Sequence, residues 1–197
     1  MRSIKTVVSL LCFALAACGG HSHRGPLQVH LTYGGPDSGM KLPAVKPCGS
    51  VLVRLELAVK EPGVIGKNLQ SSTPIPITAD PAEVQGYLSK SIESELERLS
   101  FKLAKAPESA KKTLVISVTQ LQVEEDNTYN ALVDATVDVR GPNGAVLTQR
   151  MVRGDGKRWG RSLDASEYNK ALNNAVVSLL NRILEDEELM KALATGC

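Results

Sequence analysis

One short stretch of this chain gathers the side chains best suited to bind a partner. The segment RMVRGDGKRWGRS, residues 150–162, contains the only tryptophan of the chain and several cations around it. The residues in question are Arg150, Arg153, Lys157, Arg158, Trp159 and Arg161. Arginine and tryptophan are enriched at binding hot spots, so this composition predicts a loop that binds a partner protein. Contact with lipid headgroup phosphates is a second interpretation, and a solvated basic loop whose tryptophan caps the core is a third.

A cysteine near the N-terminus offers a different chemistry. Arg2 and Lys5 precede an apolar run over residues 7–17, which is the pattern of an export signal. The run is shorter than the ~20 residues that a membrane-spanning helix needs. The sequence LAAC at residues 15–18 resembles the bacterial lipobox, in which the cysteine thiol receives diacylglycerol. The resemblance implies that residues 1–17 are a signal peptide and that Cys18 is the lipidated first residue of the mature chain.

The predicted lipidation sets the expected location. Gly19, rather than Asp, follows the cysteine, and in a Gram-negative cell this indicates the outer membrane. Three acyl chains, palmitate among them, anchor a protein firmly because each buried CH₂ adds ~0.8 kcal/mol. We therefore expect a lipid-anchored protein whose domain faces the periplasm. The alternative is an ordinary signal peptide cut near Ala17, which would leave Cys18 as a free thiol.

Two other cysteines would remain in the mature chain, because Cys12 leaves with the signal. In an oxidising periplasm, Cys48 and Cys197 have no third competitor, so they predict a disulfide bond. A loop of this length contributes about 4–5 kcal/mol in the chain-entropy model. Two unpaired thiols are the alternative.

The sequence contains little that would indicate a catalytic site or a metal site. The three histidines, His21, His23 and His30, lie in a Gly- and Pro-rich segment without a third ligand at fixed spacing. No serine lies in a nucleophile-elbow motif. The acidic residues at 124–126 are interpreted as a solvated turn rather than as a pair of catalytic carboxylates. We expect no enzyme activity, no metal site and no cofactor.

Charge argues against one class of partner. Without residues 1–17 the chain has 21 basic and 21 acidic residues, so the sequence pI near 8.3 is largely a property of the signal. A neutral chain in the periplasm is not expected to bind nucleic acid.

Hydrophobic periodicity predicts the elements that would position these residues. Residues 18–49, rich in Gly, Pro, His and Ser, are expected to form a flexible tether, and residues 50–197 a single domain. Alternation of period two predicts strands at residues 51–60, 113–123, 129–140 and 145–153. Helical spacing and capping residues predict amphipathic helices at residues 80–100 and 164–193. The expected fold is an α+β two-layer sandwich, with an antiparallel sheet of about four strands covered by two helices.

The same runs carry a family resemblance over about residues 50–193. They are VQGYLSKSIESELERLSFKL, TLVISVTQLQV, YNALVDATVDV, NGAVLTQR and the closing YNKALNNAVVSLLNRILEDEELMKAL. Together they resemble the YajG-type family of outer-membrane lipoproteins. Ser100 departs from the family pattern, which has Gly before the Phe, and the Asp-x-Arg signature after the first strand is absent. The resemblance implies no catalytic residue, only the acylated Cys18 of the lipobox.

One functional expectation and one alternative follow. We expect an outer-membrane lipoprotein, held in membrane lipid by Cys18, whose domain is a non-catalytic structural or accessory module that binds cell-envelope proteins. The alternative is an auxiliary lipoprotein of an ABC-type lipid-transport system, which would need an apolar groove between helix and sheet.

Overall fold

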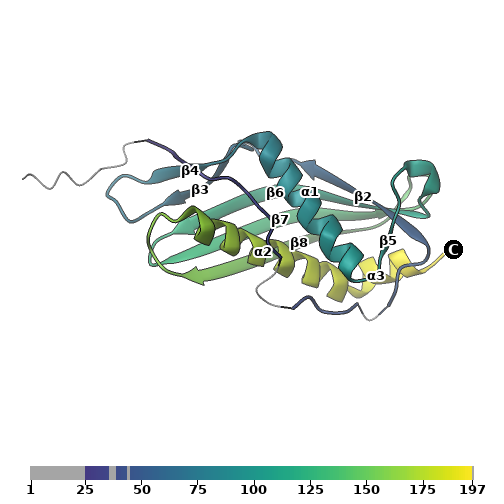
Figure 1. Ribbon diagram of the computed structural model, residues 1–197. Helices are drawn as coiled ribbons and strands as arrows, with labels where there is room; N and C mark the ends of the chain where they lie inside the picture. The colour runs from purple at the N-terminus through teal and green to yellow at the C-terminus, as the bar shows by residue number, and fades with distance from the viewer. Residues whose placement is uncertain (1–24, 36–38, 44, 197) are drawn as a thin grey trace, which may run out of the picture.

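Within residues 25–35, 39–43 and 45–196, which the computed structural model describes, the chain forms one open sheet with helices over one face (Figure 1). The strands are β1 (Leu27–Gln28), β2 (Ser50–Leu57), β3 (Val64–Asn68), β4 (Ile75–Thr78), β5 (Lys102–Leu103), β6 (Lys112–Glu125), β7 (Thr128–Arg140) and β8 (Val146–Trp159). The helices are α1 (Pro81–Arg98), α2 (Ala165–Glu185), α3 (Glu187–Ala194) and the short 3₁₀ helix η1 (Pro107–Ser109).

The three longest strands form the antiparallel meander that their alternating patterns predict. β6 pairs with β7, and β7 pairs with β8, along nearly their whole lengths. Val133, Val137 and their neighbours on one side of β7 are buried against the helices. The meander therefore follows directly from period-two patterning.

The expectation of an antiparallel sheet of about four strands is wrong, because the sheet is mixed and has eight strands. The first half of β6 pairs in parallel with β2, and its end pairs in parallel with β3. A shift in the β6–β7 pairing between Val118 and Gln120 falls between these two regions. β2 and β6 can be parallel because the chain crosses the sheet through α1 before β6 begins. Pairing direction thus depends on a crossover that periodicity does not reveal.

The remaining strands are short, and one contains a proline. β4 contains Pro76, which has no N–H to give to a neighbouring strand. β1 pairs with β4 only at Ile77 and Thr78 among the described residues, so the proline lies beyond that pairing. Strands of two to five residues with this composition give little periodic signal.

Capping residues start α1 and α2 where the sequence predicts a start. Asp80 accepts hydrogen bonds from the backbone N–H groups of Ala82 and Glu83, and Asp164 accepts one from Ser166. The second predicted helix is divided at Asp186, whose extended backbone ends α2 and begins α3. No helix in the described part of the chain is long and apolar enough to cross a membrane.

A segment from the N-terminal part of the chain packs across the two long helices (Figure 1). Val29 is fully buried and Leu31 nearly so. The Leu31 N–H donates to Glu83 Oε1 of α1 at 2.7 Å, and the Thr32 N–H donates to Asn169 Oδ1 of α2 at 3.0 Å. The described part of the predicted tether is therefore in contact with the domain from β1 onward.

Candidate functional site

β8 is an edge strand of the sheet. It spans 14 residues, and in the described part of the chain it pairs only with β7. An edge strand presents backbone N–H and C=O groups that another strand can pair with. The length of this edge makes it the first candidate for a binding surface.

The two faces of β8 differ in how far they are exposed to solvent. Val152, Gly154 and Gly156 point towards α2 and are buried. Met151 and Trp159 point the other way, and these residues are 85% and 80% exposed. The open face of this strand therefore presents two large apolar side chains to solvent.

Two glycines bring α2 directly onto β8. A Cβ atom at Gly154 would lie 2.1 Å from the carbonyl oxygen of Ala175, and one at Gly156 would lie 2.1 Å from that of Ala171. Both distances are far inside van der Waals contact, so a side chain at either position would force the helix away. The glycines in RGDGKRW thus serve helix–strand packing and lie within the strand rather than in a turn.

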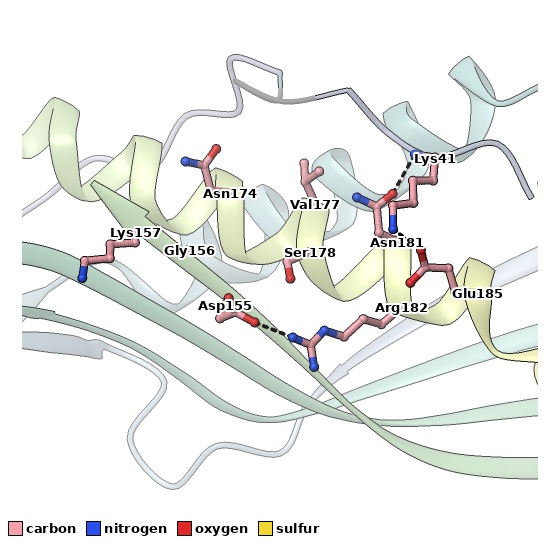
Figure 2. A pocket seen from close by; sticks show the side chains of 10 residues that line it. All are labelled: Lys41, Asp155, Gly156, Lys157, Asn174, Val177, Ser178, Asn181, Arg182 and Glu185. Atoms are coloured by element: carbon pink, nitrogen blue, oxygen red, sulfur yellow. Dashed lines mark hydrogen bonds and ion pairs between the residues drawn. The ribbon is translucent and has the colours of Figure 1, made fainter. Parts of the chain in front are cut away.

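A polar groove of about 680 Å³ runs between this strand and the outer side of α2 (Figure 2). We call it the edge groove. It is lined by Lys41, Asp155, Gly156, Lys157, Asn174, Val177, Ser178, Asn181, Arg182 and Glu185. It places the backbone of an edge strand and the polar side of a helix together on one concave surface.

An ion pair spans the edge groove. Arg182 Nη2 of α2 lies 2.7 Å from Asp155 Oδ1 of β8, and both side chains are more than half exposed. Exposed pairs of this kind contribute about 0–1 kcal/mol, so a ligand can displace this one at little cost. The buried Oδ1 of Asn174 accepts no hydrogen bond from the described residues, which leaves an acceptor in the wall of the edge groove.

The residues predicted to form a basic binding loop lie mainly on a strand. β8 extends to Trp159, so of the six residues only Arg161 follows the strand. Register with β7 places Arg150 and Arg158 on the helix-facing side, and Arg153, Lys157 and Trp159 on the open side. The stretch was expected to leave the sheet after Arg153, but the hydrogen-bonded pairing with β7 continues.

The cations on the open side have different partners. Arg153 makes two hydrogen bonds to the carboxylate of Asp134 on β7, at 2.7 and 2.8 Å, and these bonds raise the pKa of Arg153. Lys157 Nζ lies 5.1 Å from the centroid of the Trp159 ring, within range of a cation–π contact. Arg161 donates to the side chain of Asn127 at 3.2 Å. Trp159 does not cap the core, because it is largely exposed.

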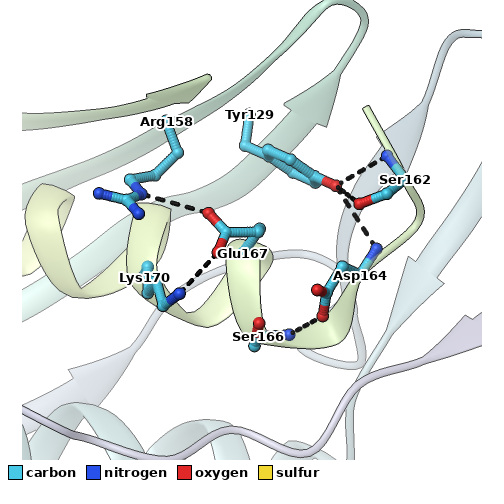
Figure 3. Close-up of polar contacts among 7 residues, drawn as sticks. All are labelled: Tyr129, Arg158, Ser162, Asp164, Ser166, Glu167 and Lys170. Carbon is cyan, nitrogen blue, oxygen red and sulfur yellow. Dashed lines mark hydrogen bonds and ion pairs between the residues drawn. The ribbon is translucent and has the colours of Figure 1, made fainter. Parts of the chain in front are cut away.

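The cations on the helix-facing side are paired with acids of the helices. Arg150 Nε lies 3.7 Å from Asp186, and the Arg150 guanidinium also pairs with Glu188. Arg158 Nε lies 3.2 Å from Glu167 Oε2 of α2, and Lys170 lies 2.6 Å from the other oxygen (Figure 3). The hydrogen bond from Lys170, with a further one from Arg158, lowers the pKa of Glu167.

The connection from β8 to α2 is held by a second set of hydrogen bonds (Figure 3). The hydroxyl of Tyr129 lies 3.0 Å from the Ser162 hydroxyl and accepts from the N–H of Asp164 at 3.4 Å. Asp164 caps α2 by accepting from the Ser166 N–H at 2.8 Å, which lowers the pKa of Asp164. The end of β8 is thereby fixed relative to the helix.

A buried carboxylate also accepts hydrogen bonds from the connection between β8 and α2. Glu125 is fully buried at the end of β6. Its Oε1 accepts from Gln70 Nε2 at 2.6 Å and from the N–H groups of Ser162 and Leu163 at 2.9 and 3.2 Å. Its Oε2 accepts from the hydroxyl of Tyr168, whose pKa is raised by burial and by this hydrogen bond.

Glu125 therefore corrects the interpretation of residues 124–126 as a solvated turn. Glu124 points to the opposite face of the sheet, where it pairs with Lys67 at 3.0 Å. The two neighbouring acids cannot act as a catalytic pair, because strand alternation separates them. The sequence contains one signal that could have identified Glu125 as buried. It follows Leu121 and Val123 at a spacing of two residues, so it lies on the same, buried face of the strand.

The other predicted residues lie partly outside the described chain. Cys18, His21, His23 and Cys197 are not among the described residues. His30 has an 81% exposed side chain and lies 3.5 Å from Glu83. Within the described ranges, no group of three or more His, Cys, Asp or Glu side chains is arranged to hold a metal ion.

Cys48 lies beside the C-terminal helix. Its backbone N–H donates to the carbonyl of Leu193, four residues before Cys197, at 2.9 Å. The bond between Cys48 and Cys197 stays a prediction.

Comparison with known proteins identifies the family. The model of a family described as uncharacterized lipoprotein, Lipoprotein_16 or YajG-type, matches residues 65–194. The chain belongs to this family. Members of the Lipoprotein_16 family are lipoproteins, so this chain is a membrane-anchored lipoprotein. No curated protein sequence matches the chain significantly.

One of the similar solved structures supports the fold assignment. Protein XCC0632 from Xanthomonas campestris, which belongs to family model DUF330, is 13% identical, with 85% of this chain and 94% of that chain covered and a TM-score of 0.51. A minor lipoprotein from Acinetobacter baumannii is 13% identical, with 72% and 94% covered and a TM-score of 0.40. Lipoprotein GNA1162 from Neisseria meningitidis is 15% identical, with 71% and 100% covered and a TM-score of 0.40. At these identities, the match to the Xanthomonas protein indicates a shared fold and nothing further.

Proposed function

We propose that this lipoprotein is a non-catalytic accessory module of the bacterial cell envelope, anchored in the outer membrane through Cys18 with its domain in the periplasm. Its role is to bind a partner protein along β8. The observation that carries this proposal is the 14-residue edge, which pairs on one side only in the described chain and has the edge groove beside it.

The mode of binding follows from the geometry of the edge groove. An extended segment of a partner adds to a free strand edge through backbone hydrogen bonds, and side-chain pockets beside the edge give specificity. Here the wall beside the edge is the polar side of α2, with Asn174, Ser178 and Asn181 along it. An extended partner segment with polar side chains towards α2 fits this surface. It would displace the exposed pair between Arg182 and Asp155.

Site-directed photocrosslinking in the envelope tests this proposal. A photoreactive amino acid replaces Ser178, inside the edge groove, and a matched variant carries it at Glu93, on the exposed side of α1. We expect one protein adduct from position 178 and none from position 93. Adduct formation should fall when Asn174→Trp fills the edge groove. Equal adducts at both positions, or an adduct that survives the filled groove, would contradict binding along β8.

A second candidate function is the auxiliary subunit of an ABC-type lipid-transport system. One observation favours it: a mainly apolar hollow of about 660 Å³, lined by Leu42, Val45, Leu184 and Met190 among others. The hollow lies between Lys41, Leu42 and Val45 on one side and the α2–α3 region on the other, rather than between helix and sheet. Lipid that purifies with the protein and is lost in the variant Met190→Glu would favour this function over protein binding.

A further inference from the structure

The described domain of this lipoprotein lies close along the chain to its predicted anchor. Gly25 is the first described residue, and β1 begins two residues later. Because Val29 is fully buried, the chain belongs to the domain from this point. Only residues 19–24 separate Cys18 from Gly25.

This short connection limits how the domain can stand on the membrane. A fully extended chain advances at most about 3.6 Å per residue, so Gly25 lies within about 25 Å of Cys18. The 13 residues of β7 at about 3.3 Å each extend over about 43 Å. The connection is thus much shorter than the sheet, and the end of the sheet that contains Gly25 is the end held near the lipid.

Strand register places Trp159 at that same end. Figure 1 shows the end of β8 on the same side of the sheet as β3 and β4. Leu27 of β1 pairs with Ile77, so Gly25 is level with the start of β4. From there a row of paired residues crosses the sheet to β8, through Ile75, Asn68, Glu125, Tyr129 and Arg158. Five strand spacings of about 4.8 Å put Trp159 about 24 Å across the sheet from the point where the chain enters it.

The side chains at this end suit a lipid surface. Trp159 is 80% exposed, and tryptophan is enriched where proteins meet lipid headgroups. Neither Lys157 nor Arg161 has a carboxylate partner among the described residues. Asp126 and Asp164 lie near this end of the sheet. Each carboxylate accepts a hydrogen bond from a backbone N–H at 2.8 Å, and neither pairs with Lys157 or Arg161. Cations beside an exposed tryptophan are attracted to anionic headgroups.

We propose that the end of the domain bearing Lys157, Trp159 and Arg161 rests on the headgroups of the membrane in which Cys18 is anchored. This inference depends on the anchoring stated under the proposed function, but not on protein binding along β8. It also assigns different tasks to two parts of one strand. The end of β8 contacts lipid, and the edge groove from Asp155 towards Glu185 stays accessible to a partner, with Lys157 at the border of the two.

Fluorescence of the only tryptophan tests this orientation directly. The full lipidated protein is reconstituted into vesicles of phosphatidylethanolamine and phosphatidylglycerol, with and without brominated acyl chains. We expect the bromine to quench Trp159 emission, and the emission maximum to lie to the blue of that of the lipid-free protein. Lys157→Glu combined with Arg161→Glu should weaken the quenching. Unchanged quenching in this variant would overturn the role given to the two cations.

A relocated tryptophan provides the matched control. The variant Trp159→Phe, Met151→Trp moves the fluorophore to another exposed position on the same face of β8. Eight residues of strand place it about 26 Å from the original site, away from the proposed membrane contact. We expect no quenching from position 151.

The mass of the intact protein separates the possible failures. If the acyl chains are present and Trp159 is not quenched, the orientation is wrong while the anchoring stands. Equal quenching from positions 159 and 151 would also overturn the orientation, because the strand would then lie flat on the lipid. A mass without acyl chains on Cys18 would overturn the anchoring and this inference together.

Discussion

Glu125 shows how one side chain connects three parts of the molecule. Its carboxylate joins the segment after β3, the connection before α2 and the first turns of α2 through four hydrogen bonds. A buried carboxylate is tolerated when its oxygens are satisfied in this way. The same residue supports the end of β8 on which both proposals depend.

Replacing this carboxylate should destabilise the domain. Glu125→Ala leaves the buried hydroxyl of Tyr168 without its acceptor, together with the more exposed side-chain amide of Gln70 and the N–H groups of Ser162 and Leu163. An unsatisfied buried group costs about 1–3 kcal/mol, whereas the exposed donors can bond to water, so we expect a loss of about 1–3 kcal/mol in the free energy of unfolding, measured with urea.

The neighbouring acid is the control for this measurement. Glu124 is partly exposed and pairs with Lys67, so Glu124→Ala should cost no more than about 1 kcal/mol. Similar losses in the two variants would show that the hydrogen bonds to Glu125 are not what holds this region.

At the scale of elements, the packing of α2 on β8 depends on two positions without a side chain. Gly154→Ala places a methyl group against the backbone of α2, where a Cβ would lie 2.1 Å from Ala175 O. We expect destabilisation of about 1–3 kcal/mol or more, since overpacking forces the backbone to shift. Thermal unfolding followed by circular dichroism measures it.

Gly86 on α1 provides the opposite case. An added Cβ there meets nothing within 4 Å, and the residue is exposed inside a helix. Gly86→Ala should therefore stabilise the protein by about 0.5–1 kcal/mol. If both alanines destabilised the protein equally, close packing would not explain the effect at Gly154.

The first turn of α2 should make stability depend on pH. The pKa of Glu167 is lowered by Lys170 and Arg158, so ionisation of Glu167 favours the folded state. Because the folded pKa is depressed, this stabilisation is present above the ordinary glutamate pKa of about 4.3 and is lost as the pH falls through the folded pKa.

The variant Glu167→Gln isolates this contribution. It should be less stable than the unmodified protein at neutral pH, and the difference should shrink as the pH falls below about 4. Urea unfolding across this range measures the difference. A difference that is constant with pH would mean that the charge of Glu167 is not responsible.

At the scale of the whole molecule, the predicted disulfide would tie the start of β2 to the end of α3. The hydrogen bond from Cys48 to Leu193 brings these two distant parts of the chain into contact. A bond from Cys48 to Cys197 would close a loop of nearly the whole domain and contribute about 4–5 kcal/mol.

Cys48→Ser tests the bond. We expect the oxidised, unmodified protein to have an intact mass lower by two hydrogens than after reduction, and to lose stability on reduction. The variant should already have the lower stability and should not respond to reductant. A reductant response that persists in the variant would contradict this pairing.

The topology of the sheet shows where sequence-based prediction stops. The meander of β6, β7 and β8 was predictable because its hairpin connections are local and its alternation is regular. The parallel neighbours β2 and β3 were not, since their partners lie far along the chain beyond α1. For the same reason, a sheet of about four strands was expected where eight are present.

Local patterns in the sequence were enough to predict the family, the two long helices with their N-caps, the three-stranded meander and the segment rich in arginine beside the only tryptophan. These features depend on local periodicity and on residues close together in the chain. Three other features became visible only in the folded chain: this segment continues a strand, α2 packs against its glycines, and Glu125 is buried. Each of these depends on partners contributed by distant parts of the chain, and their distances are set only when the sheet and helices pack.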